Sequence, residues 1–469
     1  MNTYRNDALI GGTWRSAPAT VDVENPATEV SIGTAAACDE AMAHAAVAAA
    51  RKAARDWGLM PPSERAALLD ALVQELRHRR DDLVSVTVAE VGVSVVNARA
   101  WHVDLAIDLI ASAAGNARTY RFEEAVGNSL LIRKPVGVVS CITPWNYPLY
   151  QLAAKVGPAL AAGCTVVLKP AELTPLSAYL FAEATVAAGL PEGVFNLVPG
   201  SGKVVGATLV AHPDVDLVSF TGSTMVGRQV GAAASANLKR VCLELGGKSS
   251  SLVCADADLA EAVRASVDSA MLNSGQTCSA WTRLLVPADL YEDALVIAGD
   301  HARSLVLGDP RSEDTDLGPL ISAKQRADVV TVIEGAIARG ARVVAGGPER
   351  PGALGHFVSP TILADLDPSD PASQSEIFGP VLVVHPYATE SEAIDIANGT
   401  PYGLSGAVWS GSADRALAIA RLLDTGQVDL NGAAFNPEAP FGGWKDSGLG
   451  RELGVAGLEE YTELTSVQR

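Results

Sequence analysis

The sequence predicts an α/β fold with two open parallel β-sheets, each covered by helices on both faces. Strand-like and helix-like segments alternate at βαβ spacing from residue 136 to about 223, and a second such series runs from about 249 to 431. The run Val136–Ile142 is nearly all apolar, as expected of a parallel strand buried on both faces. The length of 469 residues corresponds to about three domains at roughly 150 residues each.

The first 120 residues are expected to add short strands followed by helices. Residues 8–32 read as strands and turns, with a hairpin signal at Gly11-Gly12. Asp39 is expected to cap an Ala-rich helix that runs to Trp57. Further helices are expected from Pro61 onward and across roughly 81–120.

Two segments look different from the rest. Residues 121–135 form two strand-like runs around Gly127-Asn128, and such a ribbon buries little by itself, so it is expected to project and pack on another element. The tail Leu458–Val467 reads as a short edge strand. In the α/β region, the expected elements are helices at 148–162 and 175–188, strands at 164–168, 194–198 and 215–220, and a helix that begins at Ser223.

Charge and targeting signals narrow the class of protein. The formal net charge is −19, which argues against nucleic acid and anionic membranes as partners, although it does not exclude an anionic cofactor. Charges at Arg5, Asp7 and Arg15 interrupt any signal-peptide core, and no apolar run reaches the ~18 residues of a spanning helix. A cytoplasmic location is therefore expected.

The six cysteines show no Cys-x-x-Cys pair and no histidine at ligand spacing. A disulfide framework, structural zinc and any other metal site are therefore not expected. Most of the cysteines should be inert core residues. Cys278 differs, because Ser274-Gly275-Gln276-Thr277 precede it and leave its sulfur accessible.

Three strand-end turns are candidates for nucleotide binding. Gly200-Ser-Gly202-Lys-Val-Val-Gly206 has one residue too many for the usual dinucleotide fingerprint, and alone such a turn is more often only a turn. Ser223 in Phe220-Thr-Gly-Ser223 can cap a helix whose free N–H groups face an anion. Lys169-Pro-Ala-Glu172 offers a donor and an acceptor for ribose hydroxyls, although an isolated pair would read as a solvated surface pair. Together they favour a nucleotide site.

A second group of residues suggests covalent acyl chemistry. Cys278 supplies a thiol, Glu244 a carboxylate beside Gly246-Gly247, and Asn146 an amide between two prolines. A thiolate nucleophile, a carboxylate base and an amide donor are the set that such chemistry requires.

These segments make the chain resemble the NAD(P)-dependent aldehyde dehydrogenase superfamily over essentially its full length. The matching segments, in family order, are Pro144-Trp-Asn-Tyr-Pro148, Lys169-Pro-Ala-Glu172, Phe220-Thr-Gly-Ser223, Leu243-Glu-Leu-Gly-Gly-Lys248, Gly275-Gln-Thr-Cys278, Glu376-Ile-Phe-Gly-Pro380 and Pro440-Phe-Gly-Gly-Trp-Lys-Asp-Ser-Gly-Leu-Gly-Arg-Glu452. The resemblance implies two Rossmann-like domains and a β ribbon for oligomerisation. The implied units are an NAD-binding domain of residues 1–120 and 136–247, a catalytic domain of 248–446, and oligomerisation segments 121–135 and 459–469 of a homodimer or homotetramer.

The resemblance also implies a role for each site residue. Cys278 would attack the aldehyde carbon, Asn146 and the Cys278 N–H would hold the oxyanion, and Glu244 would activate the water that hydrolyses the thioester. Lys169 and Glu172 would bind the adenosine ribose. The other implied cofactor contacts are Gly222 and Ser223 at the pyrophosphate, Glu376 at the nicotinamide ribose, Phe378 beside it, and Ile142, Trp145, Gly202, Phe220 and Leu245 lining the cleft. The negative Glu172 would repel a 2′-phosphate, which favours NAD over NADP.

The sequence departs from the family pattern at Ser249-Ser250 and at Trp281, which either narrows the pocket or fills core. The implied substrate tunnel contains Tyr147, Tyr150, Trp281, Phe435 and Phe441, and this lining favours an apolar or aromatic aldehyde over a charged one. Two alternatives stay open. A CoA-acylating semialdehyde dehydrogenase is disfavoured by Glu244, and a non-catalytic, crystallin-like protein is disfavoured by the joint presence of Cys278, Glu244 and Asn146.

Overall fold

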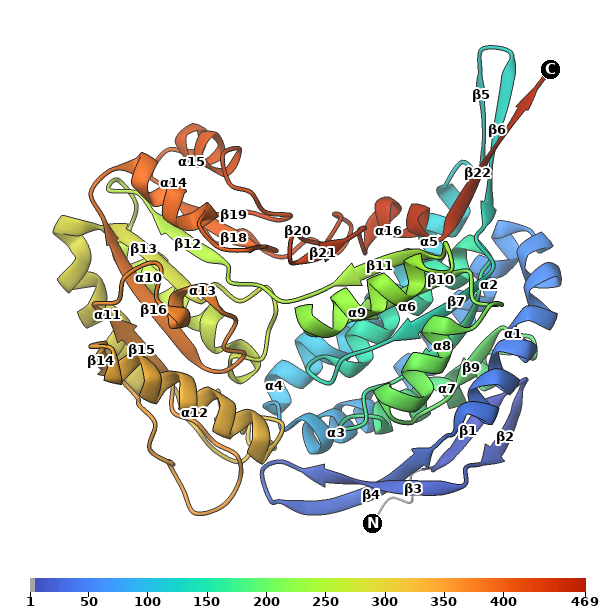
Figure 1. Ribbon diagram of the computed structural model, residues 1–469, viewed down its shortest axis with the longest axis horizontal. Coiled ribbons are helices and arrows are strands. Elements are labelled where there is room, and N and C mark those ends of the chain that lie inside the picture. Colours follow the sequence, from blue (N-terminus) through green and yellow to red (C-terminus); the bar gives the residue numbers. More distant parts are fainter. Residues whose placement is uncertain (1–4) are drawn as a thin grey trace.

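A computed structural model describes residues 5–469, and two β-sheets form the cores of two lobes that lie side by side (Figure 1). The first sheet has the order β2-β1-β9-β8-β7-β10-β11-β21, and the second has the order β14-β15-β16-β13-β12-β18-β19. Both are parallel at their centres, as predicted, but β1, β2, β21 and β14 are antiparallel strands at the edges. These antiparallel strands lie outside the βαβ units, so the strand–helix alternation in the sequence does not predict them.

The first sheet brings together segments from the whole chain. Its strands are β1 (Asp7–Ile10), β2 (Thr13–Ser16), β7 (Val138–Ile142), β8 (Thr165–Lys169), β9 (Phe195–Leu197), β10 (Leu217–Thr221), β11 (Arg240–Glu244) and β21 (Gly448–Leu449). The helices of this lobe are α1 (Glu40–Leu59), α2 (Pro62–His78), α3 (Arg80–Val91), α4 (Val95–Asn97), α5 (Leu105–Thr119), α6 (Pro148–Ala162), α7 (Leu176–Ala187), α8 (Ala207–Ala211), α9 (Thr224–Ser235) and α16 (Gly454–Glu460). Apolar clusters on the two faces of the sheet pack on α2, α5, α6 and α7 and on α1, α8 and α9.

The predicted helix starts at Asp39 and Ser223 are confirmed, because both side chains accept a hydrogen bond from the first turn of the helix that follows. The predicted helical stretch 81–120 contains a π-helical segment, Ala98–Asp104, between α4 and α5. Helix α6 is buried along its whole length, as its nearly uniform apolar sequence suggests.

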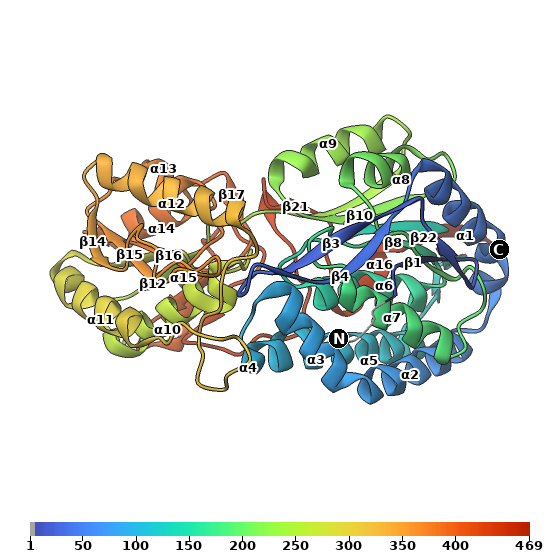
Figure 2. The ribbon, with the colours of Figure 1, turned by 90° about the horizontal axis from the view of Figure 1, so that it is seen from below.

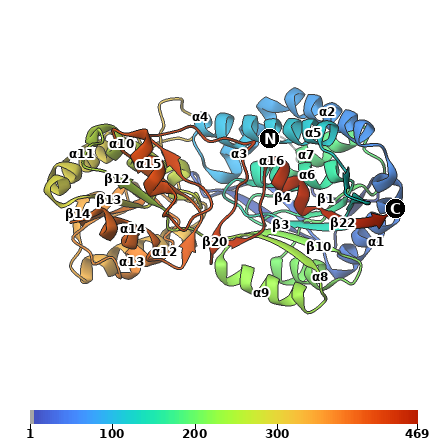
Figure 3. The ribbon, with the colours of Figure 1, turned by 90° about the horizontal axis from the view of Figure 1, so that it is seen from above.

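The second lobe has a separate core. Its strands are β12 (Ser250–Val253), β13 (Arg283–Pro287), β14 (Arg342–Ala345), β15 (Thr361–Ala364), β16 (Val381–Tyr387), β18 (Gly406–Trp409) and β19 (Asp429–Leu430). Its helices are α10 (Leu259–Met271), α11 (Tyr291–Ser304), α12 (Ala323–Ala338), α13 (Pro371–Gln374), α14 (Glu390–Asn398) and α15 (Ala413–Ala420). A short pair, β17 (Tyr402–Gly403) and β20 (Trp444–Lys445), lies where the chain returns to the first lobe. Figure 3 shows this crossing from above.

A three-stranded ribbon projects from the first lobe (Figure 1). It consists of β5 (Glu123–Val126), β6 (Ser129–Pro135) and β22 (Thr462–Gln468), and β22 pairs with β6 along its full length. The prediction of a strand from Leu458 is wrong at its start, because Leu458–Glu460 belong to α16. The residues just before Tyr461 show no alternation of apolar and polar side chains, which a strand would require, and they form the last turn of α16.

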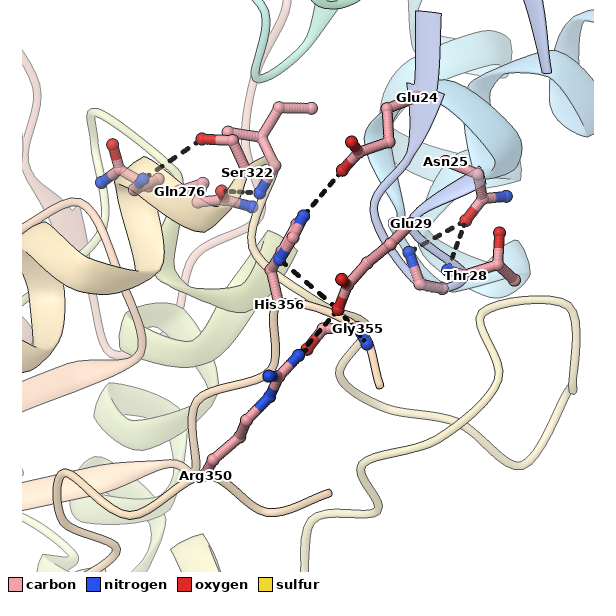
Figure 4. A network of polar contacts seen from close by, with 12 residues as sticks. Glu24, Asn25, Thr28, Glu29, Gln276, Ser322, Arg350, Gly355 and His356 are labelled. Carbon is pink, nitrogen blue, oxygen red and sulfur yellow. Dashed lines mark hydrogen bonds and ion pairs between the residues drawn. The ribbon is translucent and has the colours of Figure 1, made fainter. Parts of the chain in front are cut away.

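A long hairpin of β3 (Ala19–Asn25) and β4 (Val30–Ala37) reaches from the first lobe to the second (Figure 2). At its tip the His356 backbone N–H donates to the Pro26 carbonyl at 3.0 Å. The His356 ring lies 2.7 Å from Glu24, and Glu29 accepts from Arg350 at 2.7 Å (Figure 4). These polar contacts fasten the loop around residue 356 to the first lobe.

No helix in residues 5–469 is long and apolar enough to cross a membrane.

Glu90 of α3 provides a test of the first lobe. Its carboxylate accepts from the Leu176 and Ser177 N–H groups at 2.7 and 3.1 Å, at the start of α7, where no side chain of α7 acts as a cap. Glu90→Ala would leave both buried donors unpaired, at a cost of about 2–4 kcal/mol. We expect the apparent melting temperature to fall by about 2–4 °C in a thermal scan, because a chain of this length loses roughly 1 °C per kcal/mol. The exposed Glu334→Ala is the control, and an equal melting temperature for both variants would contradict this role.

Candidate active site

Cys278 lies on a tight loop that follows a short 3-10 turn, Leu272–Gly275. Asn273 and Ser274 have φ angles of 51° and 57°, a left-handed conformation that non-glycine residues rarely adopt. Gly275 has φ 75°, and a Cβ there would lie 2.1 Å from the Gly379 carbonyl. The loop is therefore held in a strained shape by its surroundings, as is common near functional sites.

The first lobe holds this loop through the segment after β7. The Asn146 side chain donates to the Gln276 carbonyl at 3.0 Å, and Asn273 donates to the Asn146 carbonyl at 2.9 Å. The Tyr147 hydroxyl lies 2.7 Å from the Thr277 hydroxyl. An amide nitrogen has two N–H groups, so Asn146 keeps one donor for a ligand while the other fixes the loop.

The second lobe holds the same loop from the opposite side. The Gln276 side-chain carbonyl accepts from the Ile321 N–H at 2.9 Å, and Ser274 donates to the Gly318 carbonyl at 2.8 Å. The Leu320 N–H donates to the His356 carbonyl at 3.0 Å. Figure 4 shows Gln276 and the His356 contacts in one network that reaches the β3–β4 hairpin.

Cys278 is the one partly exposed cysteine of the six, and the other five are buried. Burial raises the pKa of the Cys278 thiol, and the nearby carboxylates of Glu376 and Glu244 raise it further. The thiol is therefore neutral until positive charge arrives nearby or a base removes its proton.

Glu244 ends β11 and is buried, and within residues 5–469 neither carboxylate oxygen has a hydrogen-bond partner. Burial raises its pKa well above the ordinary value, Glu452 raises it further, and Lys155 lowers it. A Cβ at Gly442 would lie 2.7 Å from Glu244 Oε1, so only glycine leaves room there. An unpartnered buried carboxylate is costly and is typical of a catalytic site.

Sequence reasoning missed the buried pair behind Glu244. Lys155 Nζ donates to Glu452 and, at 2.6 Å, to the Thr221 hydroxyl, and both charged side chains are almost fully buried. The signal that could have found Lys155 is that it is the single charged residue of α6. Glu452 ends the matching segment that begins at Pro440, but that motif does not reveal its pairing with Lys155, which lies almost 300 positions away in the sequence.

The predicted nucleotide contacts gather at the carboxyl ends of β8, β10 and β11. Glu172 Oε1 accepts from the Gly202 N–H at 3.1 Å, and Lys169 Nζ donates to the Pro170 carbonyl at 2.7 Å. Burial lowers the pKa of Lys169 to about 8. Gly222 N–H donates to the Glu244 carbonyl at 3.1 Å, which joins this group to the catalytic group. The remaining predicted residues here are buried at or beside strand ends: Ile142, Phe220 and Leu245.

The segment Glu376–Phe378 approaches this cleft from the second lobe. Glu376 Oε1 accepts from the Gly247 N–H at 3.0 Å, and burial raises the pKa of Glu376 to about 7. The Phe378 ring packs edge-on against Trp145, with ring centroids 5.2 Å apart. Ser223 caps α9, and the dipole and free N–H groups at the N-terminus of this helix favour an anion nearby. The groups around this cleft therefore fit a dinucleotide. They are the Glu172 carboxylate, the Lys169 amine, the N-terminus of α9 and the Glu376 carboxylate.

The predicted tunnel residues lie together. Cys278 lines a cavity of about 420 Å³. All five predicted side chains also line it: Tyr147, Tyr150, Trp281, Phe435 and Phe441. Trp281 both lines the cavity and packs edge-on against Trp409, so its two predicted roles are compatible. Sequence reasoning missed two acidic residues in the same wall, Asp268 and Asp429.

The chain was compared with known proteins. The model of the aldehyde dehydrogenase family matches residues 14–467. A 3-succinoylsemialdehyde-pyridine dehydrogenase from a Pseudomonas species is 45% identical, with 100% of this chain and 99% of that protein covered. A crystal structure of a mutant aldehyde dehydrogenase C from Pseudomonas syringae, complexed with NAD+ and octanal, is similar at a TM-score of 0.98 and 43% identity over 100% of this chain and 99% of that one. An aldehyde dehydrogenase from Mycobacterium tuberculosis complexed with NAD+ has a TM-score of 0.97 at 41% identity, over 100% and 99%.

The charges around Cys278 predict its reactivity. Glu376→Gln removes a negative charge that raises the thiol pKa, so more thiolate should be present at a given pH. At about pH 8.5, where Glu376 is ionised in the parent protein, we expect iodoacetamide to modify Cys278 at least about threefold faster, as for a pKa drop of half a unit. Near pH 6, where the Glu376 carboxyl is protonated, the difference should fade.

Glu172→Gln is the matched control, because Glu172 does not contribute to the Cys278 pKa. Peptide mass spectrometry assigns the modified cysteine. Equal rates for Glu376→Gln and the parent protein at both pH values would contradict the electrostatic account.

Proposed function

The chain belongs to the aldehyde dehydrogenase family, and on this basis we propose that it oxidises an aldehyde to the carboxylic acid with NAD as the hydride acceptor. The observation that carries the proposal is the pairing of a partly exposed Cys278 with a buried, unpartnered Glu244 at one site. Structures of similar proteins contain NAD+, in one case together with octanal.

In the proposed reaction the Cys278 sulfur attacks the aldehyde carbon and forms a thiohemiacetal. The free N–H of Asn146 and the Cys278 backbone N–H stabilise the negative oxygen. NAD, when bound, supplies the hydride acceptor, and its positively charged ring opposes the negative charges that keep the thiol protonated. Loss of hydride from the thiohemiacetal carbon leaves a thioester on Cys278.

Glu244 completes the proposed cycle. Its carboxylate takes a proton from a water molecule, which attacks the thioester carbon and expels the Cys278 thiolate. Burial and Glu452 raise the pKa of Glu244, so it is a stronger base than an ordinary carboxylate. The sum is aldehyde, NAD+ and water giving acid, NADH and a proton.

We propose the lobes as the working units of this cycle. Residues 1–120 and 136–247 would bind NAD, and residues 248–446 would carry the nucleophile. Segments 121–135 and 459–469 would form homo-oligomer contacts, and apolar side chains exposed on the ribbon support this: Val126, Leu464 and Val467. The aromatic tunnel supports an aldehyde with an apolar or aromatic body.

Two variants test the covalent mechanism. Cys278→Ala should abolish octanal-dependent NADH formation. Glu244→Gln should still form the thioester, so we expect a burst of about one NADH per site followed by turnover slowed about 10²-fold or more. Stopped-flow absorbance of NADH measures both. Full activity of Cys278→Ala would refute the mechanism, and no NADH from the parent protein with any aldehyde would support a non-catalytic protein.

The same assay separates hydrolysis from transfer to CoA. NADH should form without CoA, and the free acid should accumulate in equal amount. NADH formation that requires CoA, with an acyl-CoA as product, would favour the CoA-acylating alternative.

Glu172 predicts the cofactor preference. Its carboxylate lies beside Gly202, where it would bind free ribose hydroxyls and repel a 2′-phosphate. Glu172→Gln should shift the ratio of kcat/KM values for NAD and NADP about tenfold towards NADP, equivalent to about 1.4 kcal/mol of repulsion removed. Exposed Glu192→Gln is the control. An unchanged ratio in Glu172→Gln, or equal use of NAD and NADP by the parent protein, would contradict this.

A further inference from the structure

An acidic side chain faces the aromatic tunnel from the edge of the second sheet. Asp429 lies on β19, in parallel register with Ala407 of β18. Side chains in register point to the same face, and those two apart on one strand do so as well, so Asp429 shares its face with Trp409. Trp409 packs on Trp281, and both Trp281 and Asp429 line the cavity that contains Cys278.

The Asp429 carboxylate has no charged partner within residues 5–469. One oxygen accepts from the Gln427 side chain at 2.9 Å, and no cationic group offsets the burial that raises its pKa. Asp268, the other acidic residue of the cavity, differs because it lies 2.6 Å from the His301 ring and its side chain is 58% exposed. Asp429 is therefore the carboxylate of this cavity that is partly buried and has no cationic partner in the described part of the chain.

A carboxylate of this kind among aromatic rings is suited to a cation. A positively charged nitrogen would pair with the carboxylate and also interact favourably with the faces of nearby indole and phenyl rings. A negatively charged group would meet only repulsion there. A neutral alkyl end would leave the carboxylate desolvated without compensation.

We propose that Asp429 is a specificity-determining residue that selects aldehydes whose far end carries a positively charged nitrogen, such as a protonated amine, a pyridinium or a quaternary ammonium group. The proposal rests on the aldehyde oxidation proposed above and adds a charged end to the apolar or aromatic body that the tunnel walls accept. It modifies the expectation, drawn from the aromatic residues alone, that the substrate carries no charge. Dicarboxylic semialdehydes are the class that this arrangement disfavours.

A matched pair of aldehydes isolates the charge. The cation 4-(trimethylammonio)butanal and the neutral 5,5-dimethylhexanal have the same shape, because a quaternary carbon replaces the nitrogen. For the parent protein we expect kcat/KM to be at least about tenfold higher for the cation. In Asp429→Asn, which keeps the hydrogen bond from Gln427, the two values should become equal to within about twofold.

Asp268→Asn is the control, because it removes a carboxylate of the same cavity that already has a partner, and it should retain the preference for the cation. A parent protein that does not prefer the cation, or an Asp429→Asn variant that keeps the preference, would overturn the inference. The neutral aldehyde distinguishes failure of the substrate inference from failure of the proposed aldehyde oxidation. If the parent protein forms NADH from 5,5-dimethylhexanal or octanal but shows no preference for the cation, the substrate inference alone fails, whereas no NADH from either aldehyde or from octanal refutes the proposed function as well.

Discussion

Gln276 is the residue through which both lobes fix the position of the site. Its backbone carbonyl accepts from Asn146, which lies after a strand of the first sheet, while the Gln276 side chain is held by Ile321 of the second lobe. Two residues later the chain presents Cys278, so the thiol position depends on both lobes at once. The left-handed backbone of Asn273 and Ser274 is tolerated because these contacts, and the close approach of Gly275 to Gly379, allow no other path. These contacts from both lobes explain why the loop that carries Cys278 has a fixed position although it contains no regular secondary structure after Gly275.

Around that fixed thiol, the site gathers carboxyl groups whose ionised forms are disfavoured, because burial raises the pKa of both Glu244 and Glu376. Glu244 is buried and Glu376 is partly buried, and both raise the pKa of Cys278. Of the two buried lysines that act on these carboxylates, Lys155 is already paired with Glu452, and Lys248 lowers the pKa of Glu376 only in part against the effect of burial. Such a site is costly to the fold by itself and favours a ligand that brings a positive group, as the nicotinamide ring of oxidised NAD would. Asp429, which lines the same cavity as Cys278, is likewise a carboxylate that a positively charged ligand group would stabilise.

The sequence predicts the elements whose signals are local. Asp39 and Ser223 predict helix starts because an N-cap acts within one turn, and unbroken apolar runs predict the parallel strands. The antiparallel edges and the start of the C-terminal strand escape prediction because tertiary pairing decides them. Cys278, Glu244 and Glu452 stand in distinctive motifs, whereas the pairing of Glu452 with Lys155 and the place of Asp429 in the cavity wall appear only in the folded structure.

In the proposed cycle, Cys278 carries the acyl group between oxidation and hydrolysis. Intact-protein and peptide mass spectrometry of Glu244→Gln, mixed with octanal and NAD and quenched in acid, measures that intermediate directly. We expect an octanoyl adduct on the peptide that contains Cys278, and this adduct should appear with NADH and decay slowly. An adduct on another residue, or NADH formation at full yield with no adduct at any time, would contradict the proposed cycle.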